Sequence, residues 1–361
     1  MTGSDKITIG LICGGQGLEH EVDLFAVKEL ESAFDRNRYE LVLLGVDKSG
    51  VWHFALDSES LLTTIDNKIA LNPSLPIVIP RYQGQLIDQE SQSCLAKVDL
   101  FFPVADDPLQ SFLQSLDVPY VGADSYGSAI ARDKDVTKRL LRDHGFPIIP
   151  YLTLRSGQTV SFHEVSQQLG LPLFVKACRL GSSIGVFKVT EEEEFNRALK
   201  EAFTYDRKVL IEQAIEGREI ECAVLGNEFP QAAEVLGEIT QLEGFFTFEA
   251  KYLSNHQGQI QIPALLEDHL VQKMREAAVS AFVLLECEGL ARIDFFLKPD
   301  GSFVILEINS SPGLSKHLMY SKLWEFSNVS HNELLDRLIK LAMDRYQQVK
   351  KLRTTPGDLT F

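Results

Sequence analysis

The sequence predicts an α/β fold of two or three domains, and three observations support this prediction. The chain has 361 residues, enough for that many separate hydrophobic cores. Residues 7–13 and 39–46 are apolar runs separated by a helical pattern, the order expected of a parallel sheet. Residues 290–308 predict a β-hairpin, because two apolar runs flank the turn sequence KPDG at 298–301.

Composition and charge narrow the class of function. Hydrophobic residues make up 45% and charged residues 24% of the chain, which is ordinary for a globular protein. The net charge of −16 argues against binding to nucleic acid or to an anionic membrane, although a local basic pocket for phosphate stays possible. The five cysteines form no CxxC pair, which indicates free thiols in a reducing compartment. Because we find neither a signal-peptide pattern nor a run near the roughly 20 apolar residues of a membrane span, we expect a soluble cytoplasmic protein.

The N-terminal segment predicts a parallel-sheet domain. Its first strand, residues 7–13, precedes a helix with an apolar stripe at Val22, Ala26, Leu30 and Ala33–Phe34. The later elements are strands at 39–46 and 98–104, a short helix at 109–116, and a fourth strand or its end at 119–122. Residues 52–93 have no regular pattern apart from some strand character at 76–80, and we assign them no function.

A glycine-rich turn follows the first strand. Strand, glycine turn and helix N-terminus together make a ligand site at the carboxyl end of the strand. Glu19 in this turn would hold the ammonium of a ligand. The alternative is a first-turn carboxylate that the helix dipole stabilises.

The middle of the chain predicts a phosphate-binding loop. A helix at 133–144 carries Lys134 in its first turn, where the dipole disfavours a cation, so Lys134 is either used or simply exposed. A strand at 172–176 ends in Lys176, and the loop GSSIG at 181–185 precedes a strand at 186–189. The backbone N–H groups of such a flap, including Ser182 and Ser183, can wrap phosphate oxygens. An ordinary hairpin turn is the alternative.

The next strands carry groups that suit a nucleoside. A helix at 191–203 is followed by strands at 208–213 and 218–225. Glu212 and Gln213, followed by the apolar backbone of Ala214 and Ile215, suit an adenine edge, and Glu219 suits a ribose hydroxyl. Each of these residues has a plainer interpretation as a solvated strand residue. Two further helices are predicted at 266–285 and 332–344, and the tail 347–361 is expected to fray.

The hairpin at 290–308 carries the strongest chemical pattern. Arg292 and Asp294 share one face of the first strand, and Glu307 and Asn309 share one face of the second. A four-residue turn would place Arg292 opposite Glu307, so that all four point to the same side. Asp294, Glu307 and Asn309 are hard oxygen ligands that suit Mg²⁺ or Mn²⁺, and Arg292 suits an anionic oxygen. A charged face that is merely solvated is the alternative.

Seven segments, taken in order, resemble the D-alanine–D-alanine ligase family of ATP-grasp enzymes. They are GGQGLEHEV (14–22), DKDVTKRLLRDHG (133–145), LPLFVKACRLGSSIGVFKV (171–189), VLIEQAIEGREIECAVLG (209–226), FEAKY (248–252), ARIDFFL (291–297) and EINSSPG (307–313). The resemblance covers nearly the whole chain. It implies an α/β, three-domain ATP-grasp architecture with an N-terminal parallel-sheet domain. The expected boundaries are 1–123, 124–213 with the lid loop, and 214–361 with the metal site.

The resemblance also implies a set of roles for the nucleotide. ATP is expected between the central and C-terminal domains, with two Mg²⁺ or Mn²⁺ ions bridging its phosphates. The residues implied to hold adenine, ribose and phosphates are Lys134, Lys176, Ser182, Ser183, Glu212, Gln213, Ala214, Ile215, Glu219 and Lys251. Those implied to hold the metal are Asp294, Glu307 and Asn309.

The amino-acid substrates have implied contacts of their own. D-alanine would attack the γ-phosphate of ATP to give an acylphosphate, which the amine of a second D-alanine then attacks. Arg292 and the Gly313 N–H would hold the oxyanion. Glu19 would fix the ammonium of the first substrate, and Ser182 and Tyr252 would link Glu19 to the closed loop over the site. The product would serve peptidoglycan synthesis, and a homodimer is expected.

The sequence departs from the family pattern at four places on the amino-acid side. The segment Val104–Leu109 lacks a His-Gly run that supports the first substrate. Asp23 replaces a serine, Phe246 replaces a tyrosine, and Leu318 stands where a serine grips the second substrate's carboxylate. Lys316 or His317 could replace that serine. Two alternatives therefore stay open: a ligase with another second substrate, such as a different D-amino or D-hydroxy acid, or a nucleotide-binding protein that has lost ligation.

Overall fold

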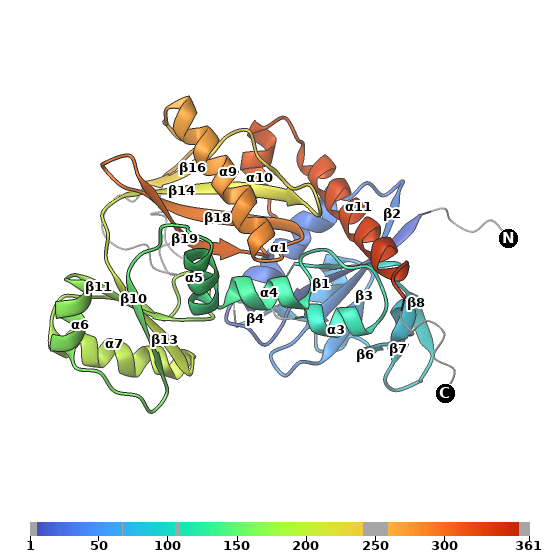
Figure 1. The fold of residues 1–361 in the computed structure, drawn as a ribbon. Coiled ribbons are helices and arrows are strands. Elements are labelled where there is room, and N and C mark those ends of the chain that lie inside the picture. The colour runs from blue at the N-terminus through green and yellow to red at the C-terminus, as the bar shows by residue number, and fades with distance from the viewer. Residues whose placement is uncertain (1–5, 67, 105–108, 241–258, 354–361) are drawn as a thin grey trace, which may run out of the picture.

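The structure is a computed structural model that describes residues 6–66, 68–104, 109–240 and 259–353. Three main sheets follow one another along the chain (Figure 1). In the described ranges, no helix has the length and apolar character needed to cross a lipid bilayer.

The N-terminal sheet has the strand order β3-β2-β1-β9. Strands β1 (Ile7–Gly14), β2 (Tyr39–Val46) and β9 (Leu100–Pro103) are parallel, while β3 (Trp52–Ala55) is antiparallel to β2. The predicted parallel sheet is therefore confirmed. The predicted fourth strand at 119–122 is wrong, since this segment makes only an isolated bridge between Phe101 and Tyr120.

The helices and hairpins around this sheet differ in part from the sequence prediction. They are α1 (His20–Ala33), α2 (Ser58–Leu61), α3 (Gln110–Ser115), β4 (Leu62–Ile65), β5 (Lys68–Leu71), β6 (Val78–Pro80), η1 (Tyr82–Gly84), β7 (Gln85–Asp88) and β8 (Cys94–Lys97). Residues 52–93 thus form short strands where we expected irregular chain. The fully buried apolar residues of α1 are Leu24, Val27 and Leu30. The expected stripe is therefore wrong at Val22 and Ala26, and it is confirmed at Leu30 and at Ala33–Phe34, which pack in the same core.

The central sheet is antiparallel, in the order β10-β13-β11-β12. Its elements and the two helices before it are α4 (Ser125–Arg132), α5 (Lys134–Asp143), β10 (Tyr151–Arg155), α6 (Phe162–Leu169), β11 (Leu173–Ala177), β12 (Val186–Val189), α7 (Glu192–Tyr205) and β13 (Lys208–Gln213). Strands β12 and β13 have the predicted bounds, whereas α4, β10 and α6 were not predicted. Helix α5 begins at an Asp133 side chain that accepts the Val136 N–H at 3.2 Å, a normal N-cap.

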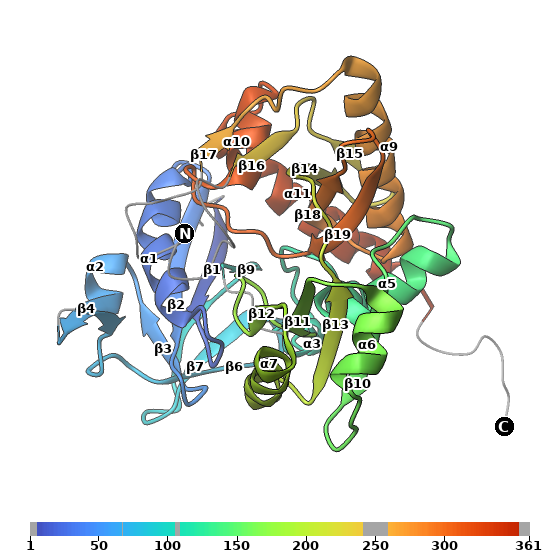
Figure 2. The same ribbon diagram turned by 90° about the vertical axis from the view of Figure 1, so that its left-hand side faces the viewer.

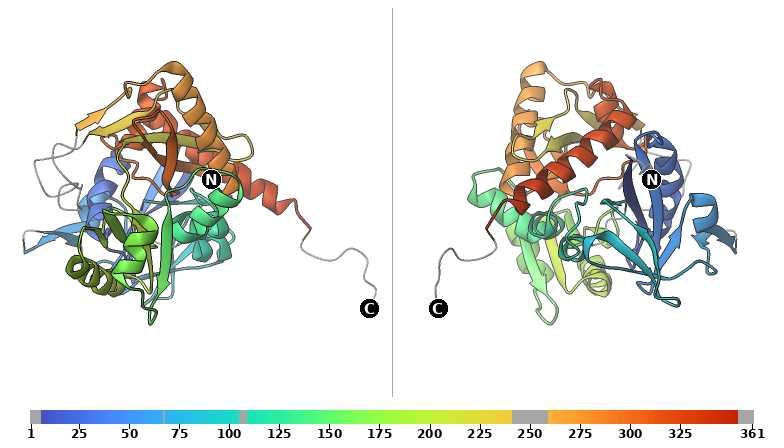
Figure 3. Two further views of the ribbon diagram at one scale, coloured as in Figure 1. Left: turned by 60° about the vertical axis from the view of Figure 1, so that its left-hand side comes forward. Right: turned by 90° about the vertical axis from the view of Figure 1, so that its right-hand side faces the viewer.

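The C-terminal sheet has the order β17-β16-β14-β18-β19, and β15 pairs with β14. The bounds are β14 (Arg218–Gly226), β15 (Gln231–Ala232), β16 (Gly237–Thr240), β17 (Gln259–Gln261), α9 (Asp268–Leu284), β18 (Gly289–Leu297), β19 (Phe303–Asn309), α10 (Met319–Phe326) and α11 (His331–Lys350). The right-hand view of Figure 3 shows α11 as a long red helix that runs diagonally across the molecule.

Helix α11 continues past the frayed tail that the sequence predicted from residue 347. Its last turns are anchored on the N-terminal region, because Arg345 donates to the Tyr120 carbonyl at 2.8 Å and Lys350 pairs with Asp117 at 2.6 Å. These partners lie more than 220 residues away in sequence, so a local pattern could not predict the extension.

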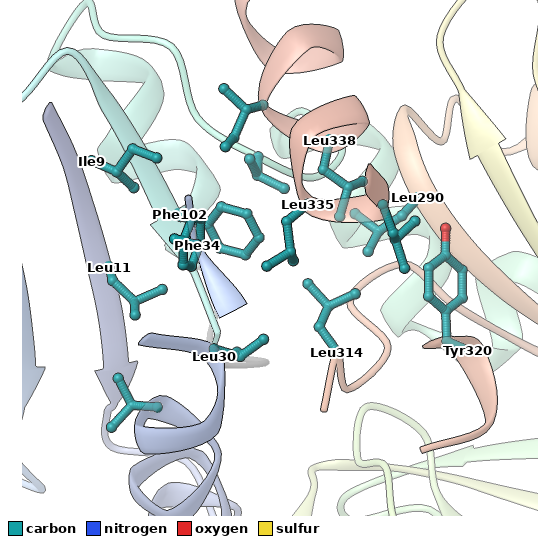
Figure 4. Close-up of a cluster of buried hydrophobic side chains, with 14 of the residues drawn as sticks. Ile9, Leu11, Leu30, Phe34, Phe102, Leu290, Leu314, Tyr320, Leu335 and Leu338 are labelled. Carbon is teal, nitrogen blue, oxygen red and sulfur yellow. The ribbon is translucent and has the colours of Figure 1, made fainter. Parts of the chain in front are cut away.

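One large apolar core joins the two ends of the chain. Figure 4 shows N-terminal and C-terminal side chains facing each other across it: Ile9, Leu11, Leu30, Phe34, Phe102, Leu290, Leu314, Tyr320, Leu335 and Leu338. The central sheet has a separate core, in which Val165, Val175 and Phe195 are fully buried. The green strands of the central sheet accordingly stand apart from the orange and red ones in Figure 2.

Candidate active site

Four polar side chains converge on one face of the C-terminal sheet, as the sequence predicts. Arg292 is opposite Asn309, and Asp294 is opposite Glu307, on the antiparallel strands β18 and β19. Directly opposed residues point to the same side of a sheet, so the four share one surface. The expected register, with Arg292 opposite Glu307, is wrong by two residues.

The reason for this difference lies in two irregularities. Leu297 pairs with Phe303, so five residues rather than four connect the strands, and the register shifts again between Asp294 and Phe295. A single slip would turn the side chains to the other face, whereas two slips restore the face. The convergence was therefore predicted correctly from an incorrect register.

The Arg292 guanidinium is held by two carboxylates. It donates to Asp294 through Nε and Nη2, both at 2.7 Å, and its Nε lies 3.1 Å from Glu221 Oε2. Burial acts to lower the pKa of Arg292, but the charges of Asp294 and Glu221 outweigh it and raise that pKa well above its ordinary value. Arg292 is thus a fixed positive charge.

Glu221 is a site residue that sequence reasoning missed. It lies on β14 directly opposite Asp294 and is 1% exposed. A buried carboxylate needs a partner, and here the partner is Arg292. The alternation of Glu219 and Glu221 on one strand face was visible in the sequence. What was missing was the pairing of β14 with β18.

Lys134 reaches the same surface from the first turn of α5. Its Nζ lies 3.1 Å from Glu307 Oε2 and donates to the Leu180 carbonyl at 2.7 Å. Burial acts to lower the pKa of Lys134, but the charge of Glu307 outweighs it and raises the pKa. The cation in the first helical turn therefore has a partner on another element.

The oxygen donors on this surface fit a hard divalent cation. Asp294 and Glu307 supply carboxylates, and the Asn309 amide oxygen accepts the Ser311 N–H at 3.0 Å. Within the described ranges, no three His, Cys, Asp or Glu side chains form a group that could hold a metal ion, and the third donor proposed here is an amide. Mg²⁺ is commonly held by one or two carboxylates together with substrate phosphates, so the donor set suits it.

A second charged cluster joins helix α5 to strands β11 and β13 of the central sheet. Glu212 is 1% exposed, and its two oxygens face Lys138 and Lys176, the latter at 2.5 Å. Burial acts to raise the pKa of Glu212, but the charges of Lys138 and Lys176 outweigh it and lower the pKa. Burial lowers the pKa of Lys138, which Glu212 only partly offsets. Lys138 had not been singled out in the sequence.

The residues expected at the adenine follow Glu212 at the end of β13. The Gln213 N–H donates to the Pro150 carbonyl at 3.1 Å, and the Ala214 N–H donates to the Pro172 carbonyl at 2.9 Å. An adenine edge would therefore meet the Ala214 carbonyl or the Ile215 backbone rather than these N–H groups. Glu219 lies two residues before Glu221, on the face that carries Asp294.

The GSSIG loop bridges two regions of the protein. Ser182 and Ser183 have φ of 51° and 61°, the left-handed region that costs non-glycine residues energy. The Ser182 hydroxyl donates to the Glu19 carboxylate, which comes from the turn before α1. The structure thus brings together Glu19 and Ser182, which lie 163 residues apart in sequence.

Comparisons with known proteins agree with this arrangement. Residues 8–123 match the family description "D-ala D-ala ligase N-terminus", and residues 140–340 match "D-ala D-ala ligase C-terminus". The chain is 44% identical to D-alanine–D-alanine ligase A of Escherichia coli K12 over 97% of this chain and 100% of that protein. It is 42% identical to the D-alanine–D-alanine ligase of Oceanobacillus iheyensis over 98% of this chain and 100% of that one.

The chain belongs to the D-alanine–D-alanine ligase family.

Solved structures support the same assignment. The D-alanine–D-alanine ligase of Coxiella burnetii superposes with a TM-score of 0.81 at 32% identity, covering 96% of this chain and 98% of that one. The VanG D-Ala:D-Ser ligase of Enterococcus faecalis gives 0.80 at 28% identity, covering 93% and 99%. The predicted ATP-grasp fold of this ligase family is confirmed. The proposed domain boundaries stay a prediction.

The loop after β19 carries Leu318, where the family resemblance expects a serine. A Cβ added to Gly313 would lie 2.4 Å from Leu318 Cδ1, so the Leu318 side chain lies directly over Gly313. The neighbouring Lys316 N–H donates to Glu29 of α1 at 2.6 Å. An apolar group therefore lies beside the N–H that the resemblance assigns to an oxyanion.

A narrow cavity lies beside Glu19, to which the family resemblance gives the ammonium of the first substrate. It has a volume of about 20 Å³, enough for roughly one water molecule, and its lining includes Glu19, Asp23, Arg132 and Gly181. Asp23, one of the four departures, thus lies in the same lining as Glu19.

Several predicted ligase residues lie outside the described residues. They are Lys251, Tyr252 and the altered Phe246, together with residues 105–108 of the segment that lacks the His-Gly run.

Proposed function

We propose that this protein joins two D-alanines into D-alanyl-D-alanine at the expense of ATP, through an acylphosphate. The observation that supports this proposal best is the convergence of Arg292, Asp294, Glu307 and Asn309 with Lys134 on one surface. We choose D-alanine as the substrate because the chain is similar over nearly its full length to proteins named D-alanine–D-alanine ligase.

The phosphate side of the reaction requires charge neutralisation. Lys134 and Lys176, with Lys251, would meet the phosphates, and the lid loop at Ser182–Ser183 would cover them. Glu212, Gln213, the Ala214–Ile215 backbone and Glu219 would hold the nucleoside. Asp294, Glu307 and Asn309 would hold two Mg²⁺ or Mn²⁺ ions, which neutralise the charge on the transferred phosphoryl group.

The amino-acid side requires positioning and exclusion of water. Glu19 would accept the ammonium of the first D-alanine while Ser182 keeps its hydrogen bond to Glu19. Tyr252 would extend this link. Arg292, with its pKa raised, stays charged and would stabilise the oxyanion formed when the second amine attacks, together with the Gly313 N–H.

The position of Leu318 favours a second candidate. Its side chain over Gly313 places a hydrocarbon where the family resemblance expects a serine hydroxyl. A ligase with altered second-substrate preference is therefore a candidate, and one similar solved structure is named a D-Ala:D-Ser ligase. In either form we place the reaction in the supply of peptidoglycan precursors, in the cytoplasm, by a homodimer.

Phosphate release from Mg-ATP tests both candidates. The assay uses D-alanine alone, L-alanine alone, and D-alanine paired with D-serine or D-lactate, with products identified by mass. D-Alanyl-D-alanine from D-alanine alone is the expected result. Turnover only with a mixed pair would favour the second candidate. ATP binding without turnover in any mixture would overturn both and leave a nucleotide-binding protein.

A further inference from the structure

A basic hollow lies beside the candidate active site, on the other face of α5. It has a volume of about 560 Å³, within the size range of small-molecule sites. Five cationic side chains line it: Arg139, Arg155, Arg179, Arg207 and Lys208. This concentration of positive charge contrasts with the net charge of −16 for the whole chain.

Three strand ends and one helix build the hollow. Arg155 is the register partner of Lys208 on β10 and β13, and the Ser156 N–H donates to the Arg207 carbonyl at 2.9 Å. Arg179 lies two residues after the end of β11, and the Cys178 N–H donates to the Lys208 carbonyl at 3.1 Å. Backbone pairing therefore fixes the backbone positions from which these cationic side chains extend.

Helix α5 separates this hollow from the nucleotide side. Lys134 and Lys138 lie four residues apart on one face of the helix and contact Glu307 and Glu212. Val136 and Arg139 lie on a different face and line the hollow. The hollow is thus distinct from the surface that we assign to ATP.

Three of the cations are held by acids. Arg179 donates to Asp206 through Nε at 3.1 Å and through Nη2. Lys208 Nζ lies 2.5 Å from Asp133 and 3.1 Å from Asp135, and Arg139 Nη2 donates to Asp135 at 2.7 Å. Burial acts to raise the pKa values of Asp135 and Asp206, but these cations outweigh it and lower both. The acids therefore stay ionised and hold the cations in place.

Two arginines remain uncompensated. Arg155 and Arg207 are exposed, and their guanidiniums form no ion pair with any described residue. Five cations against the three carboxylates Asp133, Asp135 and Asp206 leave a surplus of two positive charges. The planar guanidinium matches the oxygens of a phosphate group better than an ammonium does.

We propose that this hollow is an anion site for a ligand with a phosphate or diphosphate group, bound chiefly by Arg155 and Arg207. Arg179 directly precedes Leu180, whose carbonyl accepts from Lys134, and the lid loop begins at Gly181. Arg179, which lines the hollow, thus lies two residues before the lid loop. The site is independent of the proposed ligation reaction.

Isothermal titration calorimetry of the full chain tests the site. The nucleotide side is first saturated with Mg²⁺ and a non-hydrolysable ATP analogue. Inorganic pyrophosphate and UDP, a nucleoside diphosphate without adenine, are then titrated in separate arms. We expect the wild type to bind at least one probe, and the double variant Arg155→Ser/Arg207→Ser to bind it about tenfold or more weakly. The tighter probe identifies the source of the phosphate group.

Two further double variants serve as controls for this titration. Arg81→Ser/Arg197→Ser also removes two exposed arginines and is expected to bind as the wild type does. Arg155→Lys/Arg207→Lys keeps the charge and should recover part of the affinity, which separates a charge effect from a folding defect. Failure of both probes to bind the wild type, or equal affinity in the serine variant, would overturn the proposal. The comparison of the wild type with the variants is valid even if the ATP analogue does not bind, because all of these proteins have the same nucleotide side.

Discussion

The phosphate side of the candidate site is held by paired strands, whereas the amino-acid side is assembled from loops. On the phosphate side, Asp294 and Glu307 are opposed on β18 and β19. Arg292, which we assign to the oxyanion, stands beside them on β18, and Glu221 joins them from β14. One sheet geometry orients all four side chains. Each charge has an opposite charge as a neighbour, so removing one affects the others.

The amino-acid side has no such common frame. Glu19 lies in the turn before α1, Ser182 in a loop with left-handed backbone, and Gly313 in the chain between β19 and α10. Loops tolerate substitution more readily than paired strands do. The four departures that the family resemblance indicates all fall on this side, so we expect the two halves to change independently.

The largest expected effect is on the phosphate side. Glu307→Ala removes a proposed metal ligand and leaves Lys134 without its carboxylate partner. We expect ATP turnover to fall by about 10³-fold or more, because metal ligation supplies several kcal/mol of charge stabilisation. The measurement is ADP release over a range of Mg²⁺ concentrations.

The control for this change is Glu228→Ala, at an exposed glutamate. It should turn over as the wild type does. If the activity of Glu307→Ala is within tenfold of the wild type, Glu307 is not a metal ligand. The phosphate side would then be no more sensitive to substitution than the amino-acid side.

A smaller loss is expected from Glu221→Gln, which keeps the shape of the side chain but removes its charge. Arg292 would then keep only Asp294, and its guanidinium would be less firmly positioned. We expect kcat to fall about 10- to 100-fold, as for partners that orient a site residue, with the KM for ATP nearly unchanged.

The variant Glu221→Asp should recover part of this kcat. If Glu221→Gln alters the thermal midpoint but not kcat, then Glu221 supports the fold only, and Asp294 alone positions Arg292.

The sequence predicted the phosphate side better than the amino-acid side for a physical reason. The alternation of side chains along a strand placed Arg292, Asp294, Glu307 and Asn309 together even though the register was wrong. Glu221 and Lys138 were missed because their partners depend on which strands and helices pair across long separations. The contact of Glu19 with Ser182 across 163 residues came only from family resemblance. The extension of α11 to Lys350 likewise depends on distant anchors at Tyr120 and Asp117.

On the amino-acid side, Leu318→Ser should have a moderate effect in the opposite direction. It replaces the hydrocarbon over Gly313 by a hydroxyl that can bind a carboxylate. One such hydrogen bond is worth about 1 kcal/mol, so the KM for the second D-alanine should fall about fivefold. Initial rates over a range of D-alanine concentrations separate the second KM from the first.

The matched control is Leu265→Ser, at a leucine that is 74% exposed. An unchanged second KM in Leu318→Ser would mean that Lys316 or another group already binds this carboxylate, and that the amino-acid side has not drifted there.

The smallest effect concerns the turn that supports the loop before Glu19. The Asp47 carboxylate accepts from the Ser49 and Val51 N–H groups at 2.8 and 3.0 Å, and the adjacent Lys48 donates to the Gly17 carbonyl at 2.9 Å. Burial acts to raise the pKa of Asp47, but hydrogen bonds from the Ser49 hydroxyl and the Val51 N–H outweigh it and lower the pKa to about 2.

Because this pKa is lower in the folded state than in the unfolded chain, the Asp47 carboxylate stabilises the fold above about pH 4. The contribution is lost as the pH falls towards about 2. The side chain is 33% exposed, so we expect Asp47→Asn to lower the free energy of unfolding by only about 1 kcal/mol at pH 7, and by about half of that at pH 3. Urea unfolding at both pH values measures this, with Asp344→Asn as the exposed control. A cost that stays the same at pH 3 would mean that shape rather than charge holds the turn.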